Sequence, residues 1–263
     1  MRAKPKIIAF LGKGGSGKTV LSALFAKLLM REPDRKLLLI DADPAMGLTL
    51  ALGIKNPASI AEARKELIKT ARFARTENDK EKLAMMVDYL VLKALLERKD
   101  FSFMAMGRSQ EKGCYCSVNS LLRESIEALS ENFEFIIIDA EAGIEQVSRE
   151  VTKRVSHPII VTDSSLRGIA TASAIAQALK SSSQALPTGI IFNRAARPEP
   201  GLLKRLQSSG LKTLGAIPSD QRILDFDRKG KPLLELPLNS PALIALRQIL
   251  SEAKIFFSTG TPH

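Results

Sequence analysis

Residues 12–19 read GKGGSGKT and lie between two apolar stretches, IIAFL and VLSALFAKLLM. The spacing G-x-x-x-x-G-K-[ST] is that of a phosphate-binding loop, in which glycines let backbone N–H groups point at one anion. The lysine of such a loop reaches the terminal phosphates, and its last hydroxyl can ligate Mg²⁺. We therefore predict a nucleotide site with Mg²⁺, built from Gly12, Gly14, Gly15, Ser16, Gly17, Lys18 and Thr19. Lys13 occupies a variable position that a phosphate loop alone does not require.

Two acidic segments end other apolar runs of the chain. LLLIDADP carries Asp41 and Asp43, and FEFIIIDAEAG carries Asp139. Ligands of open parallel sheets bind at the carboxyl ends of strands, where both segments are expected to lie. We predict that Asp139 lies beside the Mg²⁺ and that Asp43 orients or activates the attacking water. A lone aspartate at such a place is often a helix cap or turn residue, but two beside a phosphate loop favour the catalytic interpretation.

The chain has two cysteines, Cys114 and Cys116, separated by one residue. In an extended segment both side chains point to the same side, and two thiolates make half of a tetrahedral or square-planar soft-metal site. A two-fold dimer could supply the other two sulfurs. The alternative is a pair of small buried side chains in a loop, and the residue types alone leave both interpretations open.

Strand and helix patterns alternate along the chain. Continuous runs of Ile, Leu, Val and Phe are typical of strands buried on both faces, so we predict an α/β fold with a mostly parallel sheet and helices on both faces. The expected strands are residues 6–11, 36–40, 133–139, 158–162, 189–192 and 213–217. The expected helices around them are residues 18–30, 165–180, 200–208, 219–228 and 241–256.

Residues 57–123 interrupt this alternation. They contain no convincing buried strand, and residues 59–69 and 77–99 read as charged helices followed by the loop with the two cysteines. We predict one domain, residues 1–263, with a helical insertion at 57–123 that carries the C-x-C loop. The methionines in and near these helices are expected to pack in the core rather than to ligate a metal: Met85, Met86, Met104 and Met106.

The formal net charge is +11, but aromatic residues make up only 5% and no long block is purely basic. This distribution favours solvated faces and contacts with nucleotide and partner proteins over binding to DNA. The apolar runs are shorter than the roughly 20 residues that cross a bilayer, and the first of them leads into the phosphate loop rather than a cleavage site. We expect a cytoplasmic protein without stable membrane insertion, whose last helix docks on the domain.

The patterns K-G-G-x-G-K-T, D-A-D-P and D-x-E-A-G together resemble the deviant-Walker ATPases, which include the MinD and ParA partitioning ATPases and nitrogenase iron protein. The resemblance implies a P-loop ATPase that binds ATP or ADP with Mg²⁺ and acts as a homodimer. In that group the additional lysine reaches the phosphates bound by the other subunit, which would make Lys13 a catalytic charge acting in trans, comparable to an arginine finger. The alternative is a solvated lysine at the crest of the loop.

Asn193 and Arg194 follow an expected strand and resemble the adenine-contacting position of this group. An amide offers a donor and an acceptor together, which suits a purine edge. Pro218 and Asp220, in GAIPSD, lie in a segment that resembles the loop lining the base. A polar turn is the alternative for the first pair, and a helix cap is the alternative for Asp220.

The stretch GRSQEKGCYCSVNSLLR, with DAEAGIE downstream, resembles the CO dehydrogenase maturation factor (CooC) family over nearly the whole chain. This implies an ATP-hydrolysing metallochaperone that assists nickel insertion into carbon monoxide dehydrogenase or the related acetyl-CoA synthase. The family's C-x-C pair binds Ni²⁺ or Zn²⁺ at the dimer interface, and Cys114 and Cys116 match it position by position. Many members have a histidine where this chain has Gln146, a departure that concerns metal handling or the client.

The resemblance also implies a working cycle. ATP closes the dimer through Lys13, closure brings the two cysteine pairs together, and hydrolysis reopens the dimer and frees the metal. Two other functions remain open: a partitioning ATPase that binds DNA or a membrane, and a metal store that binds nucleotide without turnover. A partitioning function leaves the cysteine pair unexplained. A metal store would lack the steady-state ATP hydrolysis that the metallochaperone requires.

Overall fold

The structure is a computed structural model of residues 1–263. The structure describes all of the chain except residues 1–3, 33–34, 74, 109–123, 125, 141–154, 182–187, 196–200, 202–205, 207–210 and 254–263.

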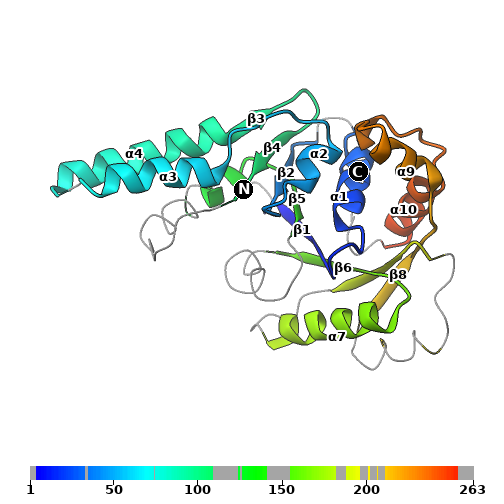
Figure 1. Ribbon diagram of the computed structural model, residues 1–263. Coiled ribbons are helices and arrows are strands. Elements are labelled where there is room, and N and C mark those ends of the chain that lie inside the picture. The colour runs from blue at the N-terminus through cyan, green and yellow to red at the C-terminus, as the bar shows by residue number, and fades with distance from the viewer. Residues whose placement is uncertain are drawn as a thin grey trace, which may run out of the picture.

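An eight-stranded sheet forms the centre of the molecule, with strand order β3-β4-β2-β5-β1-β6-β7-β8 (Figure 1). Every neighbouring pair is parallel except β3 and β4, which are antiparallel at one edge. The predicted mostly parallel α/β sheet is therefore confirmed. The strands are β1 Lys6–Leu11, β2 Leu37–Asp41, β3 Leu95–Glu97, β4 Ser102–Ala105, β5 Phe135–Asp139, β6 His157–Thr162, β7 Gly189–Asn193 and β8 Lys212–Ile217.

Helices cover both faces of this sheet. One face is packed by α1 (Lys18–Leu29), α2 (Gly47–Ala51), α9 (Gln221–Arg228), the short 3₁₀ helix η1 (Leu233–Glu235) and α10 (Pro241–Glu252). The other face is packed by α3 (Ile60–Ala71), α4 (Glu77–Ala94) and α7 (Leu166–Ser181). None of the described helices is long and apolar enough to span a membrane.

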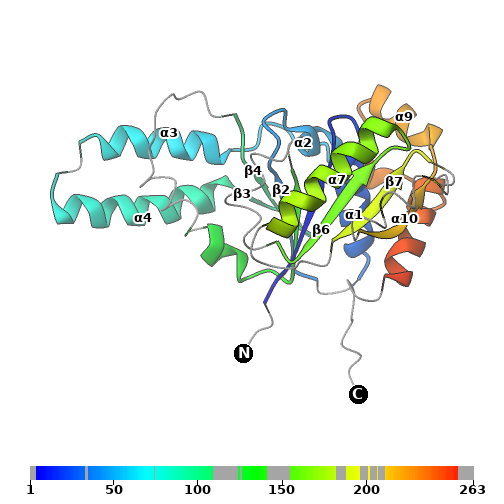
Figure 2. The ribbon, with the colours of Figure 1, turned by 90° about the horizontal axis from the view of Figure 1, so that it is seen from below.

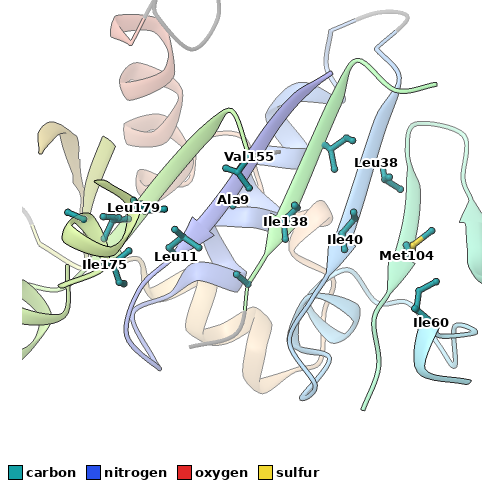
Figure 3. Packing of buried hydrophobic residues seen from close by; sticks show 14 of the residues in the cluster. Ala9, Leu11, Leu38, Ile40, Ile60, Met104, Ile138, Val155, Ile175 and Leu179 are labelled. Atoms are coloured by element: carbon teal, nitrogen blue, oxygen red, sulfur yellow. The ribbon is translucent and has the colours of Figure 1, made fainter. Parts of the chain in front are cut away.

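The continuous apolar strands divide their side chains between the two helical layers. On β1, Ile8 and Phe10 belong to the core under α1, whereas Ala9 and Leu11 belong to the core under α3, α4 and α7. Figure 3 shows the second of these cores, with side chains from several strands meeting on one face. This two-sided burial is the physical reason that the strands carry no polar alternation.

The sequence prediction was wrong in one part of the insertion. Residues 77–99 were expected to be one helix, but α4 ends at Ala94, and residues 95–97 pair as β3 with β4. Phe103, Met104 and Ala105 of β4 are fully buried next to β2. The strand is four residues long and has no β-branched side chain, so it gave little strand signal in the sequence.

Helices α3 and α4 form a hairpin that extends past the β3 edge of the sheet (Figures 1 and 2). Each begins with a capping box: Ser59 with Glu62 on α3, and Thr76 with Asp79 on α4. In this motif the cap side chain accepts from the backbone N–H of the third helical residue, and the side chain of that residue accepts from the backbone N–H of the cap residue. These two local signals explain why the charged segments of the insertion fold as two defined helices.

Candidate active site at the phosphate loop

The phosphate loop connects the end of β1 to the start of α1, as its sequence predicts. Gly12 has a φ of 149° and Gly17 a φ of 96°, values that side-chain-bearing residues rarely adopt. A Cβ on Gly12 would lie 2.2 Å from the carbonyl oxygen of Val161 on β6, so this glycine also allows close packing of the loop on the sheet. The loop thus ends at the N-terminus of α1, where unpaired backbone donors and the helix dipole favour an anion.

Thr19, at the start of α1, contacts the carboxylate that ends β5. Its hydroxyl donates to Oδ2 of Asp139 at 2.7 Å, and Ser22 lies 3.5 Å from the other carboxylate oxygen. Burial raises the pKa of Asp139 to about 7, with the nearby Asp41 acting in the same direction and the Thr19 hydrogen bond opposing it. Lys18 is also buried beside the loop. A hydroxyl and a buried carboxylate are the oxygen ligands that suit Mg²⁺, so this donor set fits the predicted ion.

Asp41 and Asp43 follow each other at the end of β2 but have different surroundings. Asp41 is fully buried and accepts hydrogen bonds from the hydroxyl of Thr49 at 2.7 Å and its backbone N–H at 2.8 Å. Its burial raises its pKa. Asp43 is only half-buried, and its carboxylate accepts from the backbone N–H of Ala45 at 2.8 Å. Asp41 therefore holds α2 through Thr49. Asp43, the predicted water-orienting residue, is more accessible and lies just beyond the carboxyl end of β2.

Asn193, at the end of β7, holds the phosphate loop from the other side. Its side-chain amide donates to the backbone carbonyl of Ser16 at 2.8 Å, and its oxygen accepts from the backbone N–H of Arg194 at 3.1 Å. Only 6% of Asn193 is exposed. Both halves of the amide are thus engaged by the protein, in a position where sequence resemblance predicts an adenine contact. Arg194 itself is exposed, with a φ of 57°.

We expect the Asn193→Ala variant to bind ADP and ATP about tenfold more weakly, because the Ser16 carbonyl loses a buried donor worth about 1–2 kcal/mol. Isothermal titration calorimetry with ATP, ADP and GTP measures this. If Asn193 supports the loop, its loss lowers the affinities for ATP and GTP by the same factor. If it contacts adenine, its loss lowers the affinity for ATP more than that for GTP. The Lys212→Ala variant, at an exposed position of the neighbouring strand β8, is the matched control. Unchanged affinity in Asn193→Ala would contradict the supporting role.

Lys13 forms an ion pair with Asp163, directly after β6. Its Nζ lies 3.1 Å from Oδ2 of Asp163, and each side chain is 38% exposed. The hydroxyl and backbone N–H of Ser165 also donate to Asp163. Hydrogen bonding from Ser165, followed by that from Lys13, lowers the pKa of Asp163, so its carboxylate is ionised at neutral pH. The structure thus gives Lys13 a partner on its own chain that sequence reasoning did not identify.

Asp220 has a structural position in this chain. Its carboxylate accepts from the backbone N–H of Arg222 at the start of α9 and from the backbone N–H of Ala242 at the start of α10. It also accepts from the hydroxyl of Ser240, which itself caps α10. Asp220 therefore joins two helix N-termini, the capping role that was its alternative interpretation. Pro218, two residues earlier, is half-buried, and a contact of either residue with the base stays a prediction.

The predicted metal-binding loop lies outside the described residues. This applies to Cys114, Cys116 and Gln146, and also to Glu141 and Gly143 of the D-x-E-A-G segment. Within the described part of the chain, no group of three or more His, Cys, Asp or Glu side chains is arranged to hold a metal ion. Nickel or zinc binding by the cysteines therefore stays a prediction from sequence.

The sequence matches the family described as the CobQ/CobB/MinD/ParA nucleotide binding domain over residues 7–233. Among individual proteins, an uncharacterized ATP-binding protein of Methanocaldococcus jannaschii is 34% identical over 249 residues, covering 92% of this chain and 96% of that protein. The carbon monoxide dehydrogenase accessory protein CooC of Rhodospirillum rubrum is 30% identical over 252 residues, covering 89% and 90%. The septum site-determining protein MinD of Synechocystis is 27% identical over 247 residues, covering 90% and 85%.

Solved structures with the same fold belong to the same group of proteins. A ParA family ATPase from Chlorobium tepidum superimposes with a TM-score of 0.69 at 19% identity, over 94% of this chain and 98% of that one. MinD of Pyrococcus horikoshii, solved with Mg-ADP, superimposes with a TM-score of 0.66 at 20% identity, over 97% and 99%. At these identities the likeness establishes the fold.

Proposed function

This chain belongs to the CobQ/CobB/MinD/ParA nucleotide-binding family, and from that premise we propose that it is a cytoplasmic, dimeric ATPase that handles nickel for carbon monoxide dehydrogenase or acetyl-CoA synthase. The observation that carries the ATPase part is the contact of Thr19 with the buried Asp139, beside Lys18 and the loop glycines. At the carboxyl ends of the strands this arrangement would combine the backbone of the phosphate loop, the charge of Lys18, and the oxygen donors of Thr19 and Asp139 for Mg²⁺.

Each residue of the site has a distinct part in the proposed hydrolysis. The loop backbone and Lys18 bind the phosphates, and Thr19 and Asp139 would hold the metal. Mg²⁺, when bound, neutralises charge on the phosphate oxygens. Asp43 orients the attacking water from the end of β2, while Lys13 of the partner subunit stabilises charge on the transferred phosphoryl group.

The cargo assignment is supported by two observations of different kinds. The sequence contains the C-x-C pair Cys114 and Cys116 in a chain that has only two histidines. In addition, a relative that aligns along 89% of this chain is named as a carbon monoxide dehydrogenase accessory protein. Two cysteine pairs related by a dimer axis would form a four-sulfur site for nickel or zinc.

We expect reduced protein under anaerobic conditions to bind about one Ni²⁺ per two chains, since four thiolates complete one site. Calorimetry measures the stoichiometry, and light scattering measures the mass of the complex. The Cys114→Ser/Cys116→Ser variant should lose this binding, while Met85→Leu, which removes an exposed thioether, should bind as the wild type does. Binding that is indifferent to the cysteines would overturn the nickel assignment and leave the ATPase intact.

A second function is favoured by the MinD relative and by the charge. The Synechocystis protein is named for septum site determination, and this chain carries a net charge of +11. A partitioning ATPase predicts ATP-dependent binding to DNA that weakens steeply with salt, or ATP-dependent binding to anionic vesicles. Neither kind of binding predicts a role for the two cysteines. A partitioning ATPase should therefore bind DNA or vesicles equally well with and without the cysteines, and this result would distinguish it from a nickel-handling protein.

A further inference from the structure

Helix α4 carries an apolar surface on the side that faces away from its own core. Met85 is 73% exposed, Tyr89 63% and Leu92 57%. We call these three residues the α4 stripe. Met85 was expected in the core from the sequence, and this expectation was wrong. Three large apolar side chains in a row on one helix are unusual for a solvated surface, where exposed apolar residues are normally scattered.

The position of the stripe follows from helical geometry. The inward face of α4 is formed by Val87, Leu90, Val91 and Ala94, which are at most 3% exposed. At 100° per residue, the α4 stripe lies on the opposite side of the helix from these residues. Because α4 belongs to the hairpin that extends past the sheet edge (Figure 2), the stripe lies on a projecting part of the molecule.

The spacing and the flanking charges of the stripe are self-complementary. Steps of four and then three residues are those of a coiled-coil seam, with Tyr89 at position a between Met85 and Leu92 at positions d. Asp88 then takes position g and Lys93 takes position e, and both side chains are exposed. In a parallel helix pair a g residue faces the e residue five positions later on the other helix, so Asp88 meets Lys93 of a second copy in both directions.

We infer that the α4 stripe is a contact surface for the α4 helix of a second copy of this chain, in a parallel two-fold arrangement. An antiparallel pair would place Asp88 opposite Asp88 and Lys93 opposite Lys93, which like-charge repulsion disfavours. Asp88 already interacts within its own chain, and its carboxylate has acceptor positions for a further partner.

The contact is weak by itself. Three side chains per copy bury much less than the roughly 1,200–2,000 Å² of a stable interface. It therefore forms at high protein concentration, or between copies that another surface already holds together. None of the three stripe residues belongs to the phosphate loop or to the cysteine pair, so the proposed contact can be tested without nucleotide or metal.

Disulfide trapping in the full chain without nucleotide tests the arrangement. In a Cys114→Ser/Cys116→Ser background, the Tyr89→Cys variant gives each copy one thiol, and the proposed arrangement brings the two thiols together at the shared two-fold axis. We expect it to cross-link in a glutathione buffer at least about tenfold faster than the Lys65→Cys variant, an exposed control on α3. Equal rates for the two variants would overturn the inference, whatever the outcome of the nickel and ATPase experiments.

Charge exchange in the same background tests the parallel pairing. Adding Asp88→Lys, or adding Lys93→Asp, should each slow cross-linking several-fold, because like charges then face each other. Mixing the two variants should restore the cross-linking rate. One variant then carries two positive charges and the other two negative charges, so opposite charges face each other only in dimers that contain one chain of each. Thermal unfolding verifies that each variant is folded. Rates that are insensitive to these charges, or no recovery on mixing, would exclude the parallel arrangement and leave the stripe for a different partner.

Discussion

Replacing Lys13 by alanine is expected to lower the steady-state rate of ATP hydrolysis about a thousandfold, with ATP affinity changed by less than about threefold. A cation supplied to the transferred phosphoryl group from another subunit contributes about 10³–10⁵ in rate. In this structure the Lys13 amine lies 3.1 Å from Asp163 at the end of β6, and its side chain is partly exposed. Phosphate release under saturating ATP, with calorimetry for binding, measures both quantities.

Mixed dimers distinguish action in trans from action in cis. A site needs its own Asp43 and, on the trans interpretation, the Lys13 of the other subunit. Inactive Lys13→Ala and inactive Asp43→Ala proteins, mixed in equal amounts, should therefore regain about a quarter of the wild-type rate, because half of the dimers are mixed and each has one complete site. No recovery on mixing would contradict the trans role.

Asp163→Asn is the control for the ion pair itself. The pair is partly exposed, and such pairs contribute about 0–1 kcal/mol. We therefore expect this variant to hydrolyse ATP within about fivefold of the wild-type rate. A loss as large as that of Lys13→Ala would show that Asp163, rather than the charge of Lys13 alone, is required for turnover.

The sequence predicted the central fold well because its strands are buried on both faces. Residues 135–138 of β5, for example, are apolar without interruption, and the alternation with helices then leaves few arrangements. The strand β4 was missed because Ser, Phe, Met and Ala give no β-branched signal over four residues. The end of α4 was missed for a related reason: Leu95 and Leu96 continue a helical apolar pattern but pair with β4 instead.

The site could be predicted only where motifs follow strands directly. Asp139 and Thr19 each come immediately at a strand end or helix start, so parallel strand geometry brings them together although they are 120 positions apart. The contacts of Asp163 with Lys13 and of Asn193 with Ser16 join residues 150 and 177 positions apart. No spacing rule encodes such pairs, because they depend on β6 and β7 following β1 in the order of the sheet.

Replacing Gly17 by alanine is expected to lower the affinity for ATP and ADP by at least about a hundredfold. The φ of Gly17 is 96°, and a Cβ there would lie 2.1 Å from the side-chain nitrogen of Asn193. Backbone strain alone contributes about 1–2 kcal/mol. Displacing Asn193 also breaks its bond to the Ser16 carbonyl, so both the loop and its support move. Titration calorimetry with each nucleotide measures the loss, and thermal unfolding verifies that the variant is folded.

The Gly15→Ala variant distinguishes the steric clash with Asn193 from the strain of a positive φ. Gly15 also has a positive φ, 74°, but a Cβ there meets nothing within 4 Å, so we expect a loss of at most about tenfold. In the Gly17→Ala/Asn193→Ala double variant the obstructing amide is absent, and the two effects should be strongly non-additive, since both act through the same contact. Equal losses for Gly15→Ala and Gly17→Ala, or additive effects in the double variant, would mean that the nucleotide affinity of the loop does not depend on its packing against β7.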